Sequence, residues 1–174
     1  MALPKFITSL GLSDTEIGAF LERRALWQGC RFAGAVAADN APNVSKPPVA
    51  FVINTQDGGD GHWEAAAFTG DHAFFFDSYG LGPGVATHLM DPSAPTNNTL
   101  RTFMREHAGK EGEGWTDCSI DLQSLGSTVC GEYSCLFLVE GPPSRQTPVW
   151  GKILSAGTSI RRDSIVRAWY LAVK

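Results

Sequence analysis

A histidine and an aspartate, His62 and Asp77, lie at the open end of a predicted β-hairpin. The apolar runs 62–68 and 72–77 flank a short turn sequence around Gly70, a pattern typical of two antiparallel strands. A turn centred on Gly70 puts the two residues in neighbouring cross-strand pairs, and a slip of one residue puts them directly opposite. Either register brings their Cβ atoms within about 4.5–8 Å of each other.

This pairing indicates one of two roles. A carboxylate beside an imidazole fixes its tautomer and supports its protonated form, as a general base requires. The alternative is a polar pair, His62 and Asp77, that caps the strand ends at the surface.

Cys130 stands at the start of a predicted helix over 128–139, with Ser127 or Thr128 as the expected N-cap. The free amides and the dipole of a helix N-terminus favour a thiolate, which is the nucleophilic form of a cysteine. Gly131 directly after it would let a substrate backbone approach closely. The alternative is an inert cysteine of the core.

Gln123 precedes Cys130 in the approach to the same helix. Its side-chain amide could donate, together with the backbone amide of Cys130, to an oxyanion that develops during attack on a carbonyl. The alternative is a solvated polar side chain.

The elements that must position these residues indicate an α+β fold. A capping box, Ser13 to Glu16, opens a helix through about Leu26, and a short apolar run at 49–53 predicts a buried strand. Segments 29–48 and 80–118 are expected to be mostly loop, the second with a short helix near 99–107. A last helix is expected near 163–172.

Length and composition predict one domain, 1–174. The chain has 43% hydrophobic and 18% charged residues with a net charge of −4, enough apolar side chain for a sizeable core. Collagenous, coiled-coil, membrane-spanning and disulfide-scaffold classes are excluded, and the acidic balance argues against wrapping nucleic acid. We see no signal peptide and expect an intracellular protein.

Four anchors occur in order along the chain, and together they resemble one known family. They are Gly61-His62-Trp63, Phe76-Asp77-Ser78-Tyr79-Gly80, Gln123 and Cys130-Gly131. The set resembles the adenovirus maturation protease (adenain) family, in the clan shared with the SUMO- and NEDD8-specific proteases. The seven-residue spacing from Gln123 to Cys130 suits the adenoviral branch. The resemblance covers about 48–140.

The resemblance implies a papain-like-clan cysteine peptidase, with a central mixed or antiparallel sheet flanked by helices and the nucleophile at a helix N-terminus. It implies Cys130 as nucleophile, His62 as general base and acid, Asp77 as the residue that orients His62, and Gln123 as oxyanion donor. Trp63 would pack beside the histidine and shield its contact with Asp77 from water. No metal and no cofactor are required for this chemistry.

The resemblance also implies partners. Adenoviral enzymes are basic and are activated by DNA and by a viral peptide held through a disulfide, for which Cys118 is the candidate here, with an unremarkable free thiol as the alternative. The acidic charge of this chain argues against DNA activation. Basic residues near the end could form a local patch, with a solvated helix face as the alternative: Lys152, Arg161, Arg162, Arg167 and Lys174.

We therefore expect a viral cysteine endopeptidase that cleaves precursor proteins at Gly-Gly or Gly-x-Gly sites, in the host nucleus and the virion. One alternative is a protease for ubiquitin or a ubiquitin-like modifier, whose tails also end in Gly-Gly. Another is an inactive member of the clan that is retained as a binding module.

Overall fold

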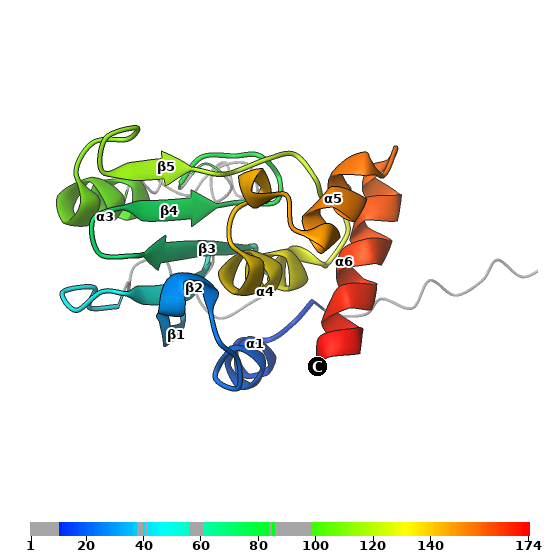
Figure 1. The fold of residues 1–174 in the computed structure, drawn as a ribbon, viewed down its shortest axis with the longest axis horizontal. Helices are drawn as coiled ribbons and strands as arrows, with labels where there is room; N and C mark the ends of the chain where they lie inside the picture. Colours follow the sequence, from blue (N-terminus) through cyan, green and yellow to red (C-terminus); the bar gives the residue numbers. More distant parts are fainter. Residues whose placement is uncertain (1–10, 38–39, 41, 56–60, 84, 86–98) are drawn as a thin grey trace, which may run out of the picture.

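The computed structural model describes residues 11–37, 40, 42–55, 61–83, 85 and 99–174. In these ranges the chain forms a mixed five-stranded sheet with helices around it (Figure 1). The strands are β1 (Arg31–Ala37), β2 (Val49–Asn54), β3 (Trp63–Phe68), β4 (Ala73–Phe76) and β5 (Trp115–Asp117). The helices are α1 (Asp14–Leu21), α3 (Thr99–Ala108), α4 (Cys130–Glu140), α5 (Pro148–Ser155) and α6 (Ser159–Val173). The predicted α+β class is confirmed.

The strands follow one another across the sheet in the order β1-β2-β3-β4-β5. The central pairs, β2 with β3 and β3 with β4, are antiparallel, whereas the outer pairs, β1 with β2 and β4 with β5, are parallel. The long antiparallel centre therefore carries the hairpin that bears His62 and Asp77, and each edge is closed by a parallel strand.

Two hydrophobic clusters lie on opposite faces of the sheet. Alternation along β3 separates them, since Ala65 and Ala67 belong to one cluster and Ala66 and Phe68 to the other. The first cluster joins the sheet to α1, α4, α5 and α6, and the second joins it to α3. Figure 1 shows α5 and α6 beside the end of the sheet at which β4 finishes. The helix that begins with Cys130, α4, thus packs between the sheet and the helices α1 and α6.

Both segments expected to be loop contain a strand. β1 lies within 29–48 and β5 within 80–118. β1 is rich in alanine and glycine, so its composition carries little strand signal. β5 has three residues, too few for a periodic pattern. Both are edge strands that the adjacent strand holds through backbone hydrogen bonds, which composition does not reveal.

The helix boundaries also differ from the predicted ones. α1 ends at Leu21 instead of Leu26, and α6 begins at Ser159 instead of 163. Thr158 accepts a hydrogen bond from the amide of Arg161, so it is the N-cap that the sequence analysis missed. α5 was not predicted, although Pro148 at its first turn is a standard helix start. The predicted capping box of Ser13 and Glu16 is confirmed.

The hairpin register differs from both predicted registers. Thr69 N–H donates to His72 O at 2.8 Å, which leaves a two-residue loop with Gly70 at φ +125°. The turn therefore centres between Gly70 and Asp71. Ala65 pairs with Phe76, and continuing this register sets Glu64 across from Asp77.

Gly131 lies where α4 meets the chain around α1. A Cβ there would lie 3.0 Å from Leu12 Cβ and 3.3 Å from Ile17 Cδ1. The glycine thus permits close packing of two helices, whereas the sequence analysis assigned it to substrate approach.

We expect Gly131→Ala to lower the free energy of unfolding by about 1–3 kcal/mol, because Leu12 and Ile17 must move to admit the methyl group. Gly18→Ala is the matched control, since no atom lies within 4 Å of the added Cβ on α1. This control should raise the free energy of unfolding by up to about 1 kcal/mol through helix propensity. Urea denaturation measures both, and equal stability of Gly131→Ala and the wild type would contradict the packing argument.

Candidate active site

His62 and Asp77 form a buried pair at the end of the central hairpin. Nε2 of His62 lies 2.5 Å from Oδ1 of Asp77, and the two side chains are 1% and 0% exposed. The Asp77 carboxylate also accepts hydrogen bonds from the amides of Tyr79 (2.9 Å) and Leu81 (3.1 Å). The predicted contact is present, and the alternative of two surface caps is wrong.

Cys130 is the first residue of α4, as predicted, but its N-cap is Val129 and not Ser127 or Thr128. The Val129 side chain makes no capping hydrogen bond, whereas the Glu132 carboxylate in the first turn accepts from its own backbone amide. The dipole at this helix start favours a negative charge near Cys130. Ser134 Oγ donates to Trp63 O at 3.2 Å and fixes α4 against the strand that follows His62.

The imidazole of His62 lies between Asp77 and Cys130. Burial alone lowers the pKa of His62, but the hydrogen bond to Asp77 and the influence of Asp77 and Cys130 outweigh it and raise the pKa to about 10. Asp77 occupies Nε2, and the buried Nδ1 has no hydrogen-bond partner among the described residues, so Nδ1 is the nitrogen that remains for the Cys130 thiol. His62 is therefore protonated at neutral pH and stands ready to pair with a thiolate.

Gln123 is 3% exposed, so the alternative of a solvated side chain is wrong. Ser78 holds it twice, since its carbonyl accepts from the Gln123 backbone amide at 3.0 Å and its hydroxyl donates to Oε1 at 2.7 Å. Nε2 donates to Ser127 O at 2.8 Å and to the hydroxyl of Tyr79 at 3.1 Å. The amide is thus fixed in the loop that leads to Cys130.

A glycine allows the segment after Asp77 to lie close to the segment before Gln123. Gly80 has φ +73°, and a Cβ there would lie 2.7 Å from the backbone nitrogen of Asp121. Tyr79 and Asp121 form an isolated antiparallel bridge across the same junction. The glycine of the resembling motif therefore lets the chain after Asp77 lie against the chain before Gln123.

Tyr79 is the aromatic neighbour of His62, with ring centroids 4.6 Å apart and planes 34° apart. Trp63 was predicted to pack beside His62. Trp63 instead packs in the core cluster beside α4, and its Nε1 donates to Leu12 O at 2.8 Å. Tyr79 stands in the resembling motif, but strand register and not residue type sets its contact with His62.

The remaining cysteines are poor nucleophiles at neutral pH. Burial raises the pKa of Cys30 to about 11 and, with the charge of Asp117, that of Cys118 to about 12; it also raises the pKa of Cys135. Cys118 is partly buried and its thiol donates weakly to Thr116 O at 3.9 Å. The disulfide between Cys118 and an activating peptide stays a prediction, and this protonated thiol does not favour rapid exchange.

A second carboxyl group, Glu64, lies beside the His62–Asp77 pair and was missed. One ligand-type atom each of His62, Glu64 and Asp77 lies within 4.8 Å of the others, all buried. Burial and then the charge of Asp77 raise the pKa of Glu64 to about 8. Glu64 is therefore mainly a neutral carboxylic acid at pH 7. The charge on the His62 imidazolium is then balanced by Asp77 and Cys130, without a contribution from Glu64.

The Gln123 loop is anchored to α6. Asp163, which is buried, accepts hydrogen bonds from the amide and the hydroxyl of Ser124 and from the hydroxyl of Tyr133. The residue after Gln123 is thereby fixed to the outer helix. Asp163 was predicted only as a helix start, and its role depends on a contact between distant segments.

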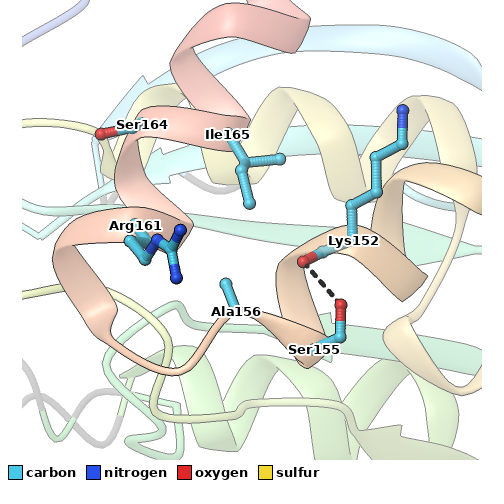
Figure 2. A pocket seen from close by; sticks show the side chains of 6 residues that line it. All are labelled: Lys152, Ser155, Ala156, Arg161, Ser164 and Ile165. Carbon is cyan, nitrogen blue, oxygen red and sulfur yellow. Dashed lines mark hydrogen bonds between the residues drawn. The ribbon is translucent and has the colours of Figure 1, made fainter.

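The basic residues near the C-terminal end have different surroundings. Arg162 donates to Asp121 O at 3.2 Å, and Arg167 pairs with Glu132 at 3.2 Å. Lys152 and Arg161 line an open hollow between α5 and α6, shown in Figure 2. The other lining residues are Ser155, Ala156, Ser164 and Ile165, so the hollow includes none of the four candidate site residues.

Comparison of the sequence with protein-family models finds no match, and comparison with curated proteins finds none.

In the described part of the chain, no helix combines the length and the hydropathy needed to cross a bilayer.

The buried acid generates a pH-dependent prediction. A carboxyl group whose pKa rises from 4.5 to about 8 on folding stabilises the protein fully below pH 4.5, and this contribution is lost as pH rises toward 8. We expect Glu64→Gln to unfold with a free energy about 1–3 kcal/mol higher than wild type at pH 8 and nearly equal at pH 5.

Urea denaturation at both pH values measures the difference. Glu113→Gln is the matched control, because Glu113 is exposed and pairs only loosely with Lys110 at 3.8 Å. A Glu64→Gln difference that is the same at pH 5 and pH 8 would rule out titration of Glu64 in this range.

Proposed function

We propose that this protein is a cysteine endopeptidase of the papain-like clan, related to the adenain family, with His62, Asp77, Gln123 and Cys130 as its site. The observation that carries the proposal is the placement of His62 between the Asp77 carboxylate and the thiol that opens α4. A nucleophile, a base and an orienting group in this order are the arrangement that acyl transfer needs.

At the start of the reaction, His62 is an imidazolium that holds the former thiol proton at Nδ1, and Cys130 is its thiolate partner. The sulfur attacks the peptide carbonyl carbon, a C–S bond forms, and the carbonyl π electrons move onto oxygen. The positive end of the α4 dipole, where Cys130 lies, favours the negative charge that this oxyanion carries. His62 then gives its proton to the amine nitrogen as the C–N bond breaks, which leaves a thioester.

Water completes the cycle. His62 accepts a proton from the water molecule whose oxygen attacks the thioester carbonyl. The C–S bond breaks and sulfur leaves with the electron pair, so that Cys130 returns as a thiolate beside the imidazolium. Asp77 stays ionised throughout and stabilises the positive charge on His62.

The substrate class follows from the resemblance and from the depth of the site. Cys130 is 7% exposed and His62 is 1% exposed, so a substrate must enter in an extended form with small side chains near the scissile bond. Gly-Gly and Gly-x-Gly junctions meet this requirement. We propose processing of viral precursor proteins in the host nucleus and the virion, with an activating peptide as a further partner.

We expect Cys130→Ala to reduce hydrolysis of a Leu-x-Gly-Gly-type peptide by at least about 10³-fold, because it removes the nucleophile. Cys30→Ala is the matched control, since Cys30 is buried, has a raised pKa and lies outside the site. Release of a fluorescent amine from the peptide measures both variants.

The same proteins should be exposed to ubiquitin, SUMO and NEDD8 probes that carry a thiol-reactive tail. Clean labelling of Cys130 by one modifier without peptide hydrolysis would support the modifier-protease alternative. A wild-type protein that neither hydrolyses the peptide nor reacts at Cys130 would contradict the proposal and support a binding module.

The raised pKa of His62 generates a second prediction. Peptide hydrolysis by the wild type should fall only as pH approaches about 10, where His62 loses the proton that the leaving amine needs. Asp77→Asn removes a hydrogen bond and a charge that raise this pKa, while burial continues to lower it. The alkaline limb of kcat/KM should therefore move down by at least about one pH unit, with kcat about 10²–10⁴ lower.

The matched control for this variant is Asp117→Asn, which changes a carboxylate of the parallel edge strand β5. Its alkaline limb should coincide with that of the wild type. An unchanged limb in Asp77→Asn would show that Asp77 does not set the protonation of His62.

A further inference from the structure

We propose that the hydroxyl of Tyr79 is a catalytic group that donates a hydrogen bond to the oxyanion and is itself held and polarised by Gln123. The inference rests on the proposed cysteine-peptidase function and deepens it. Tyr79 was quoted within the resembling motif but received no role from the sequence.

The side-chain amide of Gln123 has all of its hydrogens engaged within the protein. Nε2 carries two hydrogens, and the structure uses both, one on Ser127 O at 2.8 Å and one on the Tyr79 hydroxyl at 3.1 Å. Oε1 is held by Ser78 Oγ at 2.7 Å, which fixes the amide against rotation. Gln123 can therefore reach an oxyanion directly only if one of its own hydrogen bonds breaks.

Tyr79 contacts both members of the His62–Asp77 pair. Its ring packs on His62, and its backbone amide donates to Asp77 at 2.9 Å. Its hydroxyl accepts from Gln123 and keeps its own hydrogen for another acceptor. Tyr79 is half-buried and its hydrogen bond with Gln123 is only partly buried, so the hydroxyl is not sealed within the core.

Cys130 acts on Tyr79 as well. Burial first, and then the negative charges of Cys130, Asp163 and Asp77, raise the pKa of Tyr79 to about 12. The phenol therefore remains protonated at the pH at which the enzyme works. A neutral phenol whose oxygen accepts from an amide is a stronger donor than an isolated one, because chains of hydrogen bonds polarise one another.

The proposed step involves no proton transfer from Tyr79. As the thiolate sulfur of Cys130 bonds to the carbonyl carbon, the carbonyl oxygen gains the π electron pair. The Tyr79 O–H shortens its hydrogen bond to that oxygen, and the helix-start amides donate from α4. The interaction relaxes when the C–N bond breaks and the C=O bond returns. Gln123 is then a positioning residue, and Tyr79 touches the reacting oxygen.

The test compares Tyr79→Phe with wild type and with Tyr170→Phe. The phenylalanine keeps the ring that packs on His62 and removes only the hydroxyl. Tyr170 is the matched control, because its hydroxyl is buried on α6 and has no hydrogen-bond partner among the described residues. Three measurements are made on each protein: kcat and KM with a Leu-x-Gly-Gly-type peptide amide, the inhibition constant of the corresponding peptide aldehyde, and the rate of Cys130 alkylation by iodoacetamide.

The aldehyde forms a tetrahedral adduct with an oxyanion, whereas alkylation by iodoacetamide forms none. We expect Tyr79→Phe to lower kcat about 10²–10³-fold with KM little changed, and to weaken the aldehyde by a similar factor. The alkylation rate should stay within about threefold of wild type, and Tyr170→Phe should match wild type in all three measurements.

Other outcomes overturn the inference in distinguishable ways. Unchanged or faster turnover in Tyr79→Phe would show that the hydroxyl only blocks the Gln123 amide. An equal loss of alkylation and turnover would show that Tyr79 acts through His62 and not at the oxyanion. Failure of the wild type to hydrolyse the peptide and to react at Cys130 would instead overturn the proposed function and, with it, this role.

Discussion

The structure depends on one buried charged contact, that of His62 with Asp77. Removing an imidazolium and a carboxylate from water costs several kcal/mol for each ion unless other groups satisfy both of them. Here two backbone amides satisfy the carboxylate, and the cysteine at the start of α4 faces the other side of the ring. The neighbouring Glu64 remains mainly neutral, so it adds little negative charge. The fold must therefore hold three segments, the ends of the hairpin and the start of α4, within a few ångströms.

The chain that leaves Asp77 connects this contact to the rest of the site. Ser78 binds Gln123 through its carbonyl and its hydroxyl, and Gly80 lets the backbone of Asp121 come close. The next residue after Gln123 is fixed by Asp163 on α6. α6 therefore reaches the Gln123 amide through Asp163 and Ser124, and the segment after Asp77 reaches it through Ser78. The Gln123 loop is thus supported from both the hairpin end and the outer helix.

The sequence predicts the parts of this site that depend on local pattern. The central strands, the helix that begins at Cys130 and the proximity of His62 to Asp77 follow from apolar runs, a turn and helical spacing. Even so, the predicted hairpin register was wrong. The same stretch of residues around Gly70 suits a two-residue loop centred after Gly70 and a three-residue loop centred on Gly70, so residue type does not choose between them. That shift exchanges cross-strand partners, and it places Glu64 across from Asp77 and brings Tyr79 to the ring of His62.

The parts that could not be predicted depend on contacts between distant segments. β1 and β5 exist because a neighbouring strand supplies hydrogen bonds, and nothing in their own residues demands a strand. From the sequence alone, Gln123 could equally be a solvated residue, because its partners Ser78 and Tyr79 lie 45 and 44 residues away. The packing role of Gly131 was missed for the same reason, since the chain around Leu12 that contacts it lies far away in sequence. Residue type could nominate the four candidate positions, but only tertiary packing decides which neighbours tune them.

A site as closed as this one strengthens its own electrostatics and also restricts entry. With little water around His62, each hydrogen bond to a developing charge gains in strength, because less solvent screens it. The same closure restricts entry, because Cys130 is 7% exposed and His62 is 1% exposed. The proposed function then depends on one constraint, the burial of the His62–Asp77 pair, which both strengthens the interactions within the site and limits what can reach it.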